Sequence, residues 1–406
     1  MYPVIEIAGA RVFLGDCRDV LRSLPDNSVD SVVTDPPYEL GFMGKKWDSS
    51  GIAYDVGVWA ECLRVLKPGG HVLAFGGSRT WHRLAVAVED AGFEIRDNIA
   101  WIYGSGFPKS LDVSKAIDKR AGAEREILRA KSYEMTDGGG YSGNLNTNKP
   151  RSLSSEISAP ATSEAKQWEG WGTALKPAHE PVVVGRKPLA GTVAENVLEW
   201  GVGGLNIDGS RVGTTVETWP SSRSYGNLSD IAMTGGKAER AQKTGNAPAG
   251  RWPANVILDE HTAGLLDEQS GENPYRFFYQ AKASKRDRNE GLEELEATSA
   301  GEMVDREEGS AGMNSPRAGA GRTSGAKNFH PTVKPTQLMR YLIKLVTPPG
   351  GTVLDPFTGS GSTGKAALLD GFGFVGAELT EEYLPIIEGR LKWAIEQEGK
   401  KDDTFF

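Results

Sequence analysis

Both ends of the chain alternate short apolar runs with segments of helical periodicity, which is the pattern of an α/β protein. Within residues 1–105, strands are predicted over the runs RVFL, VDSVVT, HVLAF and FEIRDNIAWIY. Apolar residues between Trp59 and Leu66 follow helical spacing, and a second helix is expected over Leu84 and Val88. This region therefore predicts part of an open sheet covered by helices.

The same pattern returns from about residue 329. A helix is predicted over QLMRYLIKLV, and two strands, ending at Asp355 and Glu378, flank a helix that begins near Ser362. The chain ends at residue 406, which leaves room for only one more helix. We therefore expect the two ends of the chain to form one sheet together.

The middle of the chain has a different composition. Residues 126–328 are rich in Gly, Ser, Thr, Asn and Pro, which favours loops. We interpret this region as an insert with flexible loops between more structured islands. The predicted organisation is one domain made of residues 1–125 and 329–406, interrupted by residues 126–328.

Composition excludes several classes of protein. The two cysteines have no metal-ligand or disulfide spacing, so no metal site is expected. The sequence shows no signal peptide and no apolar stretch of membrane-spanning length, so we expect a cytoplasmic protein that does not contact membranes.

Basic residues gather locally although the net charge is −8. The stretch RFFYQAKASKRDR interleaves cations with aromatic residues, a combination that suits phosphate contact and base stacking. An ordinary solvated surface remains an alternative for these charges. The candidate phosphate contacts are Lys109, Lys115, Arg276, Lys282, Lys285, Arg286 and Arg288.

A glycine-rich turn follows the strand that ends at Asp355. Gly359, Gly361 and Gly364 satisfy GxGxxG, a weak signal of a nucleotide-binding turn. An acid at the start of this turn would repel a pyrophosphate and attract an ammonium group, which favours S-adenosylmethionine over NAD. Glu378 suits a ribose in either case. A nicotinamide-dependent oxidoreductase stays open as an alternative.

The stretch TDPPYEL follows another predicted strand, so it should face the same crevice. Pro36 and Pro37 fix the backbone and lack N–H donors, which leaves their carbonyl oxygens as rigid acceptors. The Asp35 carboxylate and the Pro36 carbonyl suit an amine with two hydrogens, and Tyr38 offers a face for a planar base. These groups fit the exocyclic amine of a nucleobase.

The sequence resembles the amino-directed DNA methyltransferases with the β-type motif order. TDPPYEL is similar to the catalytic motif of that family, VLDPFTGSGSTG to its cofactor motif, and NFHPTVKP to its methionine-contacting segment. LGDCRDVL resembles the stretch that contacts the cofactor adenine. The resemblance implies a circularly permuted, Rossmann-like mixed sheet with helices on both faces and a large irregular insert. It also implies that residues 1–125 and 329–406 form the catalytic domain and that residues 126–328 are an inserted target-recognition region.

The resemblance also implies the activity and its site. We expect transfer of a methyl group from S-adenosylmethionine to adenine-N6 of a flipped-out base in double-stranded DNA. Cytosine-N4 is the nearest alternative, although members with that activity usually have Ser in place of Asp35. A non-catalytic DNA-binding protein is a further alternative. The recognition sequence, a homodimer and a partner nuclease stay open. The implied cofactor contacts are Asp16, Cys17, Thr332, Lys334, Asp355, Phe357, Gly359, Gly361 and Glu378.

Overall fold

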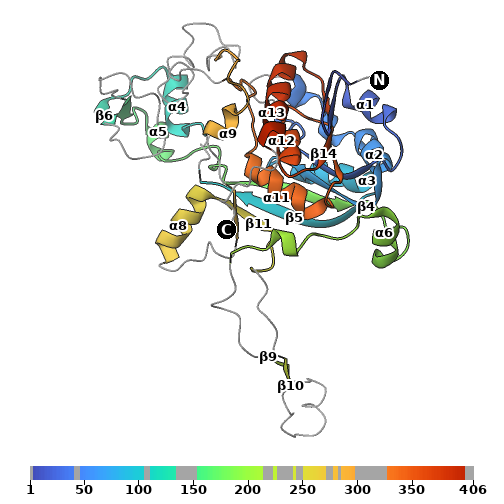
Figure 1. Cartoon of the computed structure of the whole chain (residues 1–406). Helices are drawn as coiled ribbons and strands as arrows, with labels where there is room; N and C mark the ends of the chain where they lie inside the picture. Colours follow the sequence, from blue (N-terminus) through green and yellow to red (C-terminus); the bar gives the residue numbers. More distant parts are fainter. Residues whose placement is uncertain are drawn as a thin grey trace.

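The structure is a computed structural model. It describes residues 3–40, 46–104, 110–133, 153–213, 223–225, 241–243, 250–270, 278–281, 285–297 and 327–397. Its centre is a mixed sheet of ten strands (Figure 1). In spatial order the strands are β1 (Ile5–Ile7), β2 (Ala10–Leu14), β14 (Gly373–Glu378), β13 (Thr352–Asp355), β3 (Val29–Thr34), β4 (Leu66–Phe75), β8 (His179–Arg186), β5 (Glu94–Ile102), β11 (Val256–Asp259) and β12 (Tyr279–Ala281).

The two ends of the chain meet inside this sheet. Strand β13 lies parallel to β3, with Leu354 opposite Val32, and β14 lies parallel to β2. The C-terminal strands therefore separate two N-terminal strands, and the predicted joint sheet is confirmed. The strands expected near both termini form, although β4 begins at Leu66, before the predicted run HVLAF, and β5 includes the polar residues 96–98.

Helices cover both faces of the sheet, as predicted (Figure 1). Side chains alternate along each strand, so Val33 and Val353 belong to one core while Val32 and Leu354 belong to the other. The first core includes α11 (Thr336–Val346), α12 (Ser362–Leu369) and α13 (Leu384–Gln397). The second includes α1 (Cys17–Ser23), α2 (Val56–Val65) and α3 (Trp81–Asp90).

The middle region contributes strands to the main sheet, which the sequence did not predict. Strands β8, β11 and β12 come from residues 126–328 but belong to the main sheet, so this region is not wholly separate from the catalytic domain. Strand β8 lies antiparallel between β4 and β5. Its run of three valines, Val182 to Val184, is buried between the two helical layers. The sequence indicates a structured island at this run, but no local signal shows that the run joins the main sheet.

The remaining elements lie outside the ten-stranded sheet (Figure 1). They are the helices α4 (Val113–Ala121), α5 (Ser163–Gln167), α6 (Val193–Trp200), α8 (Glu260–Ser270) and α9 (Lys285–Asn289), and the strand pairs β6 (Ile127–Tyr133) with β7 (Leu153–Ser158) and β9 (Arg223–Tyr225) with β10 (Ala241–Lys243). Short 3₁₀ turns are η2 (Lys46–Ser49), η3 (Ile52–Tyr54), η4 (Asp208–Ser210) and η7 (Glu381–Tyr383). Within the described ranges, no helix combines the length and apolar character needed to cross a bilayer.

Candidate active site

Four neighbouring parallel strands each end at or next to an acidic residue. Glu378 and Asp355 are the last residues of β14 and β13, Asp35 directly follows β3, and Asp16 follows β2 by two positions. Because the carboxyl ends of parallel strands lie at one edge of a sheet, these four acids line the same edge. The structure thus brings the predicted catalytic loop next to the predicted cofactor loop.

Asp35 is held by one cation. Its Oδ2 atom accepts a hydrogen bond from Lys334 Nζ at 2.7 Å. Its Oδ1 atom is buried and has no hydrogen-bond partner among the described residues. Burial raises the pKa of Asp35, although the Lys334 ammonium acts in the opposite direction. One carboxylate oxygen is therefore oriented while the other is available to a ligand.

Tyr38 is fixed at both its backbone and its hydroxyl. The hydroxyl donates to Glu180 Oε2 at 2.8 Å and accepts from Lys334 Nζ at 3.1 Å, while Thr80 Oγ1 donates to the Tyr38 carbonyl at 2.9 Å. The Lys334 ammonium also lies over the Tyr38 ring, 5.2 Å from its centroid. A cation thus covers part of the ring that we predicted as a stacking surface.

Glu180 is the site residue that the sequence analysis missed. It lies near the start of β8, in the region that was interpreted as an insert. Its Oε2 atom is 3.2 Å from Lys334 Nζ. The available signal was an acid directly before the apolar run PVVVG, because an acid beside a buried strand lies close to the edge of the sheet.

Asp355 connects the two adjoining strands. Its Oδ1 atom accepts from Thr34 Oγ1 at 2.6 Å and from the Phe357 amide at 3.0 Å, and its Oδ2 atom accepts from Thr363 Oγ1 at 2.5 Å. Burial raises the pKa of Asp355 to about 6. Both oxygens thus accept bonds from the chain itself, so this acid fixes the start of the glycine-rich turn against β3.

Glu378 holds the glycine-rich turn from the next strand. Its two oxygens accept from the Gly359 amide at 2.7 Å and from the Thr380 amide at 2.8 Å. Burial raises the pKa of Glu378 to about 7. Gly359 has a φ of +53°, and a Cβ atom there would lie 3.0 Å from His330 Nε2. The turn therefore requires glycine for both conformation and space.

The other predicted cofactor contacts have structural partners as well. Asp16 caps α1 by accepting from the Arg18 amide at 2.9 Å. Cys17 is buried, and burial raises the pKa of its thiol to about 12. Its backbone is therefore the part that could form hydrogen bonds with a ligand. The Thr332 carbonyl lies 2.5 Å from His330 Nδ1. Gly361, at the N-terminus of α12, has a φ of +72°.

This set of groups fits S-adenosylmethionine. Carboxylates at the ends of β2, β14 and β3 are acceptors, which suit the ribose hydroxyls and the ammonium group of that cofactor. The turn at Gly359 lets the backbone approach a ligand closely. The Asp355 carboxylate, at the start of the turn, would oppose the negative pyrophosphate of NAD at this position.

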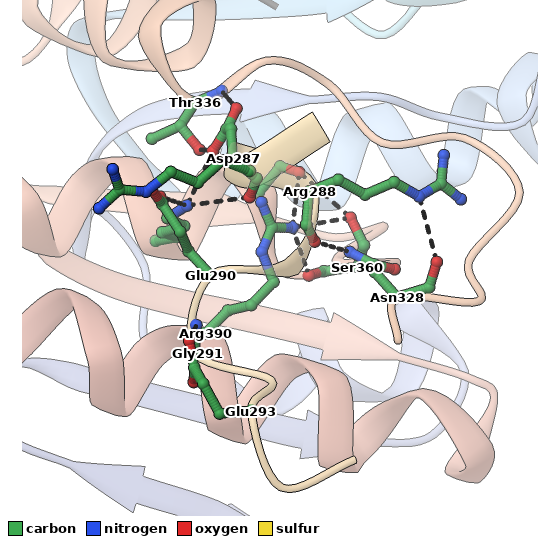
Figure 2. Close-up of polar contacts among 12 residues, drawn as sticks. Asp287, Arg288, Glu290, Gly291, Glu293, Asn328, Thr336, Ser360 and Arg390 are labelled. Carbon is green, nitrogen blue, oxygen red and sulfur yellow. Dashed lines mark hydrogen bonds and ion pairs between the residues drawn. The ribbon is translucent and has the colours of Figure 1, made fainter. Parts of the chain in front are cut away.

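Helix α9 contacts α11 and α12, the helix that follows the glycine-rich turn (Figure 2). Asp287 accepts from the Thr336 amide at 2.8 Å and from Lys365 Nζ at 2.8 Å, and Glu290 lies 2.9 Å from the same ammonium. The Lys365 side chain is fully buried in α12. Although burial acts to raise the pKa of Asp287, the Lys365 charge and the hydrogen bonds hold it below its usual value. These contacts join α9 to α11 and α12.

A buried arginine completes this support (Figure 2). Arg390, on α13, donates from Nη1 to the Ser360 carbonyl at 2.8 Å and to the Ser362 hydroxyl at 3.0 Å. Its Nε and Nη2 atoms have no partner among the described residues, and burial lowers its pKa to about 10. The backbone of the glycine-rich turn is thus held by Arg390 on one side and by Glu378 on the other.

The Asp287→Asn variant tests this support. We expect the free energy of unfolding to fall by about 2 kcal/mol, because Lys365 loses one of its two buried counter-charges while the bonds to Thr336 can persist. Denaturant unfolding measures the change. The control is Asp19→Asn, whose exposed pair with Arg22 should contribute less than about 0.5 kcal/mol. Equal effects of both variants would contradict the assigned role of α9.

The predicted phosphate contacts fall into distinct groups. Lys109, Arg276 and Lys282 lie outside the described residues, and Lys285 begins α9. The side chain of Lys115 on α4 is 51% exposed, and that of Arg286 is 87% exposed although it lies 3.2 Å from Glu290.

Arg288 has contacts inside the protein. It donates to the Asn328 carbonyl at 3.1 Å and to the His330 carbonyl at 2.6 Å (Figure 2). It thereby holds the segment that leads to Lys334. Its observed contacts are thus with backbone carbonyls of the protein itself, and its role as a phosphate contact stays a prediction.

Comparison with known proteins gives one match over most of the chain and others over short segments. The family N6_N4_Mtase, described as DNA methylase, matches residues 29–389. Type II methyltransferase M.ScaI of Streptomyces caespitosus is 41% identical over 75 residues, which are 18% of this chain and 25% of that protein. The putative methylase YubD of Escherichia coli K12 is 44% identical over 79 residues, which are 19% of this chain and 35% of that protein. The chain thus matches about a third or less of either relative.

Solved structures give long but distant alignments. The PvuII DNA methyltransferase (cytosine-N4-specific) aligns over 96% of this chain and 88% of its own, with 14% identity and a TM-score of 0.45. The putative DNA modification methylase TTHA0409 of Thermus thermophilus, complexed with S-adenosyl-L-methionine, aligns over 95% of this chain and 94% of its own, with 16% identity and a TM-score of 0.41.

The family assignment follows from the extent of the family match. That match begins at residue 29, at the start of β3, and ends at residue 389, within α13. It therefore includes both Asp35 and the glycine-rich turn, in the order predicted from the sequence. The chain belongs to the N6/N4 family of S-adenosylmethionine-dependent DNA methylases.

Proposed function

We propose that this protein transfers a methyl group from S-adenosylmethionine to the N6 amine of adenine in double-stranded DNA. The observation that carries the proposal is the position of Asp35. Asp35 directly follows β3, and its Oδ1 atom is buried without a hydrogen-bond partner in the part of the chain that the structure describes. Strand β3 pairs with β13, which leads into the glycine-rich turn. An acceptor for an amine therefore lies beside the predicted cofactor loop.

The chain's own groups can activate the amine. The lone pair of an aromatic amine is delocalised into its ring, so the nitrogen is a weak nucleophile. Hydrogen bonds from the amine to Asp35 Oδ1 and to the Pro36 carbonyl would favour a pyramidal nitrogen with its lone pair available. S-adenosylmethionine, when bound, supplies the electrophilic methyl group. Asp35 can then accept the proton that the methylated amine releases.

The target base must leave the DNA helix to reach this site, because its amine is paired inside a duplex. Tyr38 stays our candidate for stacking the flipped base, with Lys334 as a neighbouring cation. We assign phosphate contacts to the exposed side chains of Lys115 and Arg286. Recognition of a particular DNA sequence belongs to the middle region in this proposal.

Nucleoside analysis of methylated DNA tests the choice of base. We expect N6-methyladenine and no N4-methylcytosine after incubation of unmethylated plasmid with the protein and S-adenosylmethionine, because the motif begins with Asp35. Mass spectrometry of the digested DNA measures both products. Plasmid incubated without the cofactor is the control. N4-methylcytosine alone would show that the acceptor is cytosine-N4, and the absence of both products would contradict the proposed activity.

A further inference from the structure

Glu180 joins the catalytic loop to the segment that carries Lys334. One of its oxygens, Oε2, accepts a hydrogen bond from the Tyr38 hydroxyl at 2.8 Å and lies 3.2 Å from Lys334 Nζ. Lys334 Nζ in turn contacts Asp35 Oδ2 at 2.7 Å. Residues from three distant parts of the chain therefore meet through a single ammonium group and a single phenol. We call Asp35, Tyr38, Glu180 and Lys334 the acid–lysine cluster.

The acid–lysine cluster contains two acids for one base. The side chains of Asp35, Glu180 and Lys334 are 21%, 19% and 8% exposed. With both acids ionised, the cluster has a net charge of −1. Lys334 Nζ lies closer to the Asp35 carboxylate than to the Glu180 carboxylate. The other contact of Glu180 Oε2 is a hydrogen bond from the Tyr38 hydroxyl, which is neutral. The charge of Glu180 is therefore only partly balanced.

This surplus charge has a consequence for the proposed reaction. The amine nitrogen gains positive charge as its bond to the methyl group forms, and it lies at Asp35 in our proposal. Negative charge fixed near that nitrogen stabilises the transition state more than the ground state, in which the positive charge lies farther away on sulfur. A preorganised carboxylate in a site shielded from water is effective for this purpose.

We propose that Glu180 is a positioning residue for methyl transfer, which holds Tyr38 and Lys334 and supplies negative charge that favours the cationic amine. This inference rests on the proposed function. Strand β8 runs antiparallel between β4 and β5, and it brings Glu180 between the ends of these two strands. The inference therefore gives this strand a role in the site.

The charge of Glu180 should also be visible in the titration of Asp35. The titratable groups that face Asp35 are Lys334, Tyr38, Glu180 and, on the neighbouring strand, Asp355. Tyr103, which directly follows β5, interacts with Glu180, and burial, followed by the Glu180 charge, raises the pKa of Tyr103 to about 12. Glu180 repels the ionised form of Asp35, whereas Lys334 stabilises it.

Variants of the full chain separate charge from hydrogen bonding. Glu180→Gln keeps an acceptor for Tyr38 but removes the charge, so we expect the single-turnover rate of methyl transfer to fall about tenfold with little change in the KM for DNA. Glu180→Ala removes both functions and should also raise that KM. The control is Glu94→Gln, which removes an acid paired with Arg186 at 2.6 Å, at the far end of β8. It should leave both constants unchanged.

A second measurement does not depend on activity. In protein labelled with ¹³C at the aspartate carboxyl groups, the Asp35 resonance is identified by its loss in Asp35→Asn. Its titration midpoint should move to lower pH in Glu180→Gln and stay in place in Glu94→Gln. A role that merely supported the fold would not produce this shift.

The outcomes distinguish the inference from the proposed function. An unchanged rate in Glu180→Gln, or an unmoved Asp35 midpoint, overturns the role of Glu180 even if the wild-type protein methylates adenine. If the wild-type protein transfers no methyl group to DNA, the proposed function fails. The Asp35 titration then still decides whether Glu180 controls the charge of the acid–lysine cluster.

Discussion

Replacing Asp35 by Asn should reduce the rate of methyl transfer by about 10³-fold while the affinity for S-adenosylmethionine changes less than about threefold. The Asn side chain has the same shape but lacks the negative charge that stabilises a cationic amine. Its amide NH₂ group also cannot accept the released proton. Single-turnover transfer of a radiolabelled methyl group to DNA measures the rate, and calorimetry measures cofactor binding.

A matched variant lies at the other end of the same strand. Asp30, within β3, pairs with Lys67 at 2.6 Å and accepts from the Thr352 amide at 2.7 Å. Asp30→Asn therefore removes a partly buried charge from the same strand pair, away from the site. We expect a loss of stability with a nearly normal rate per folded molecule. If the two variants lost transfer equally, the effect of Asp35 would be one of folding rather than of catalysis.

The sequence predicted the parts of the fold whose signals are local. Strands β3 and β13 are largely apolar runs that end in turn residues, and the sequence predicted that both belong to one sheet. Strand β8 has an equally apolar run. No local pattern states which sheet an isolated strand joins, so its place between β4 and β5 required the tertiary structure.

The same limit applies within the site. The resemblance placed Lys334 near the cofactor, but its contact with Asp35 joins positions 299 apart in the sequence. Arg288 stands in a basic stretch that predicts phosphate contact, yet it binds the carbonyls of Asn328 and His330. Whether a cation faces DNA or the protein depends on how distant loops pack, and charge patterning carries no information about that.

Cofactor binding should depend on pH through Glu378. Burial raises the pKa of this acid to about 7, so it is partly protonated near neutral pH in the free protein. Ribose hydroxyls donate to a carboxylate better than to a carboxylic acid. We therefore expect the affinity for S-adenosylmethionine to rise about tenfold between pH 6 and pH 8, with release of a proton on binding. Calorimetry in buffers of different ionisation enthalpy measures both.

The Glu378→Gln variant should bind S-adenosylmethionine about 100-fold more weakly and lose this dependence on pH, because Gln keeps an acceptor for the Gly359 amide but carries no charge. Exposed Glu382→Gln is the control. Stability should change in the opposite sense. An acid whose pKa is raised on folding costs the free protein stability as pH rises from about 4.5 to about 7, and Gln removes that cost. If Glu378→Gln weakened binding equally at pH 6 and pH 8 relative to the wild type, its carboxylate would not be the group that receives the ribose.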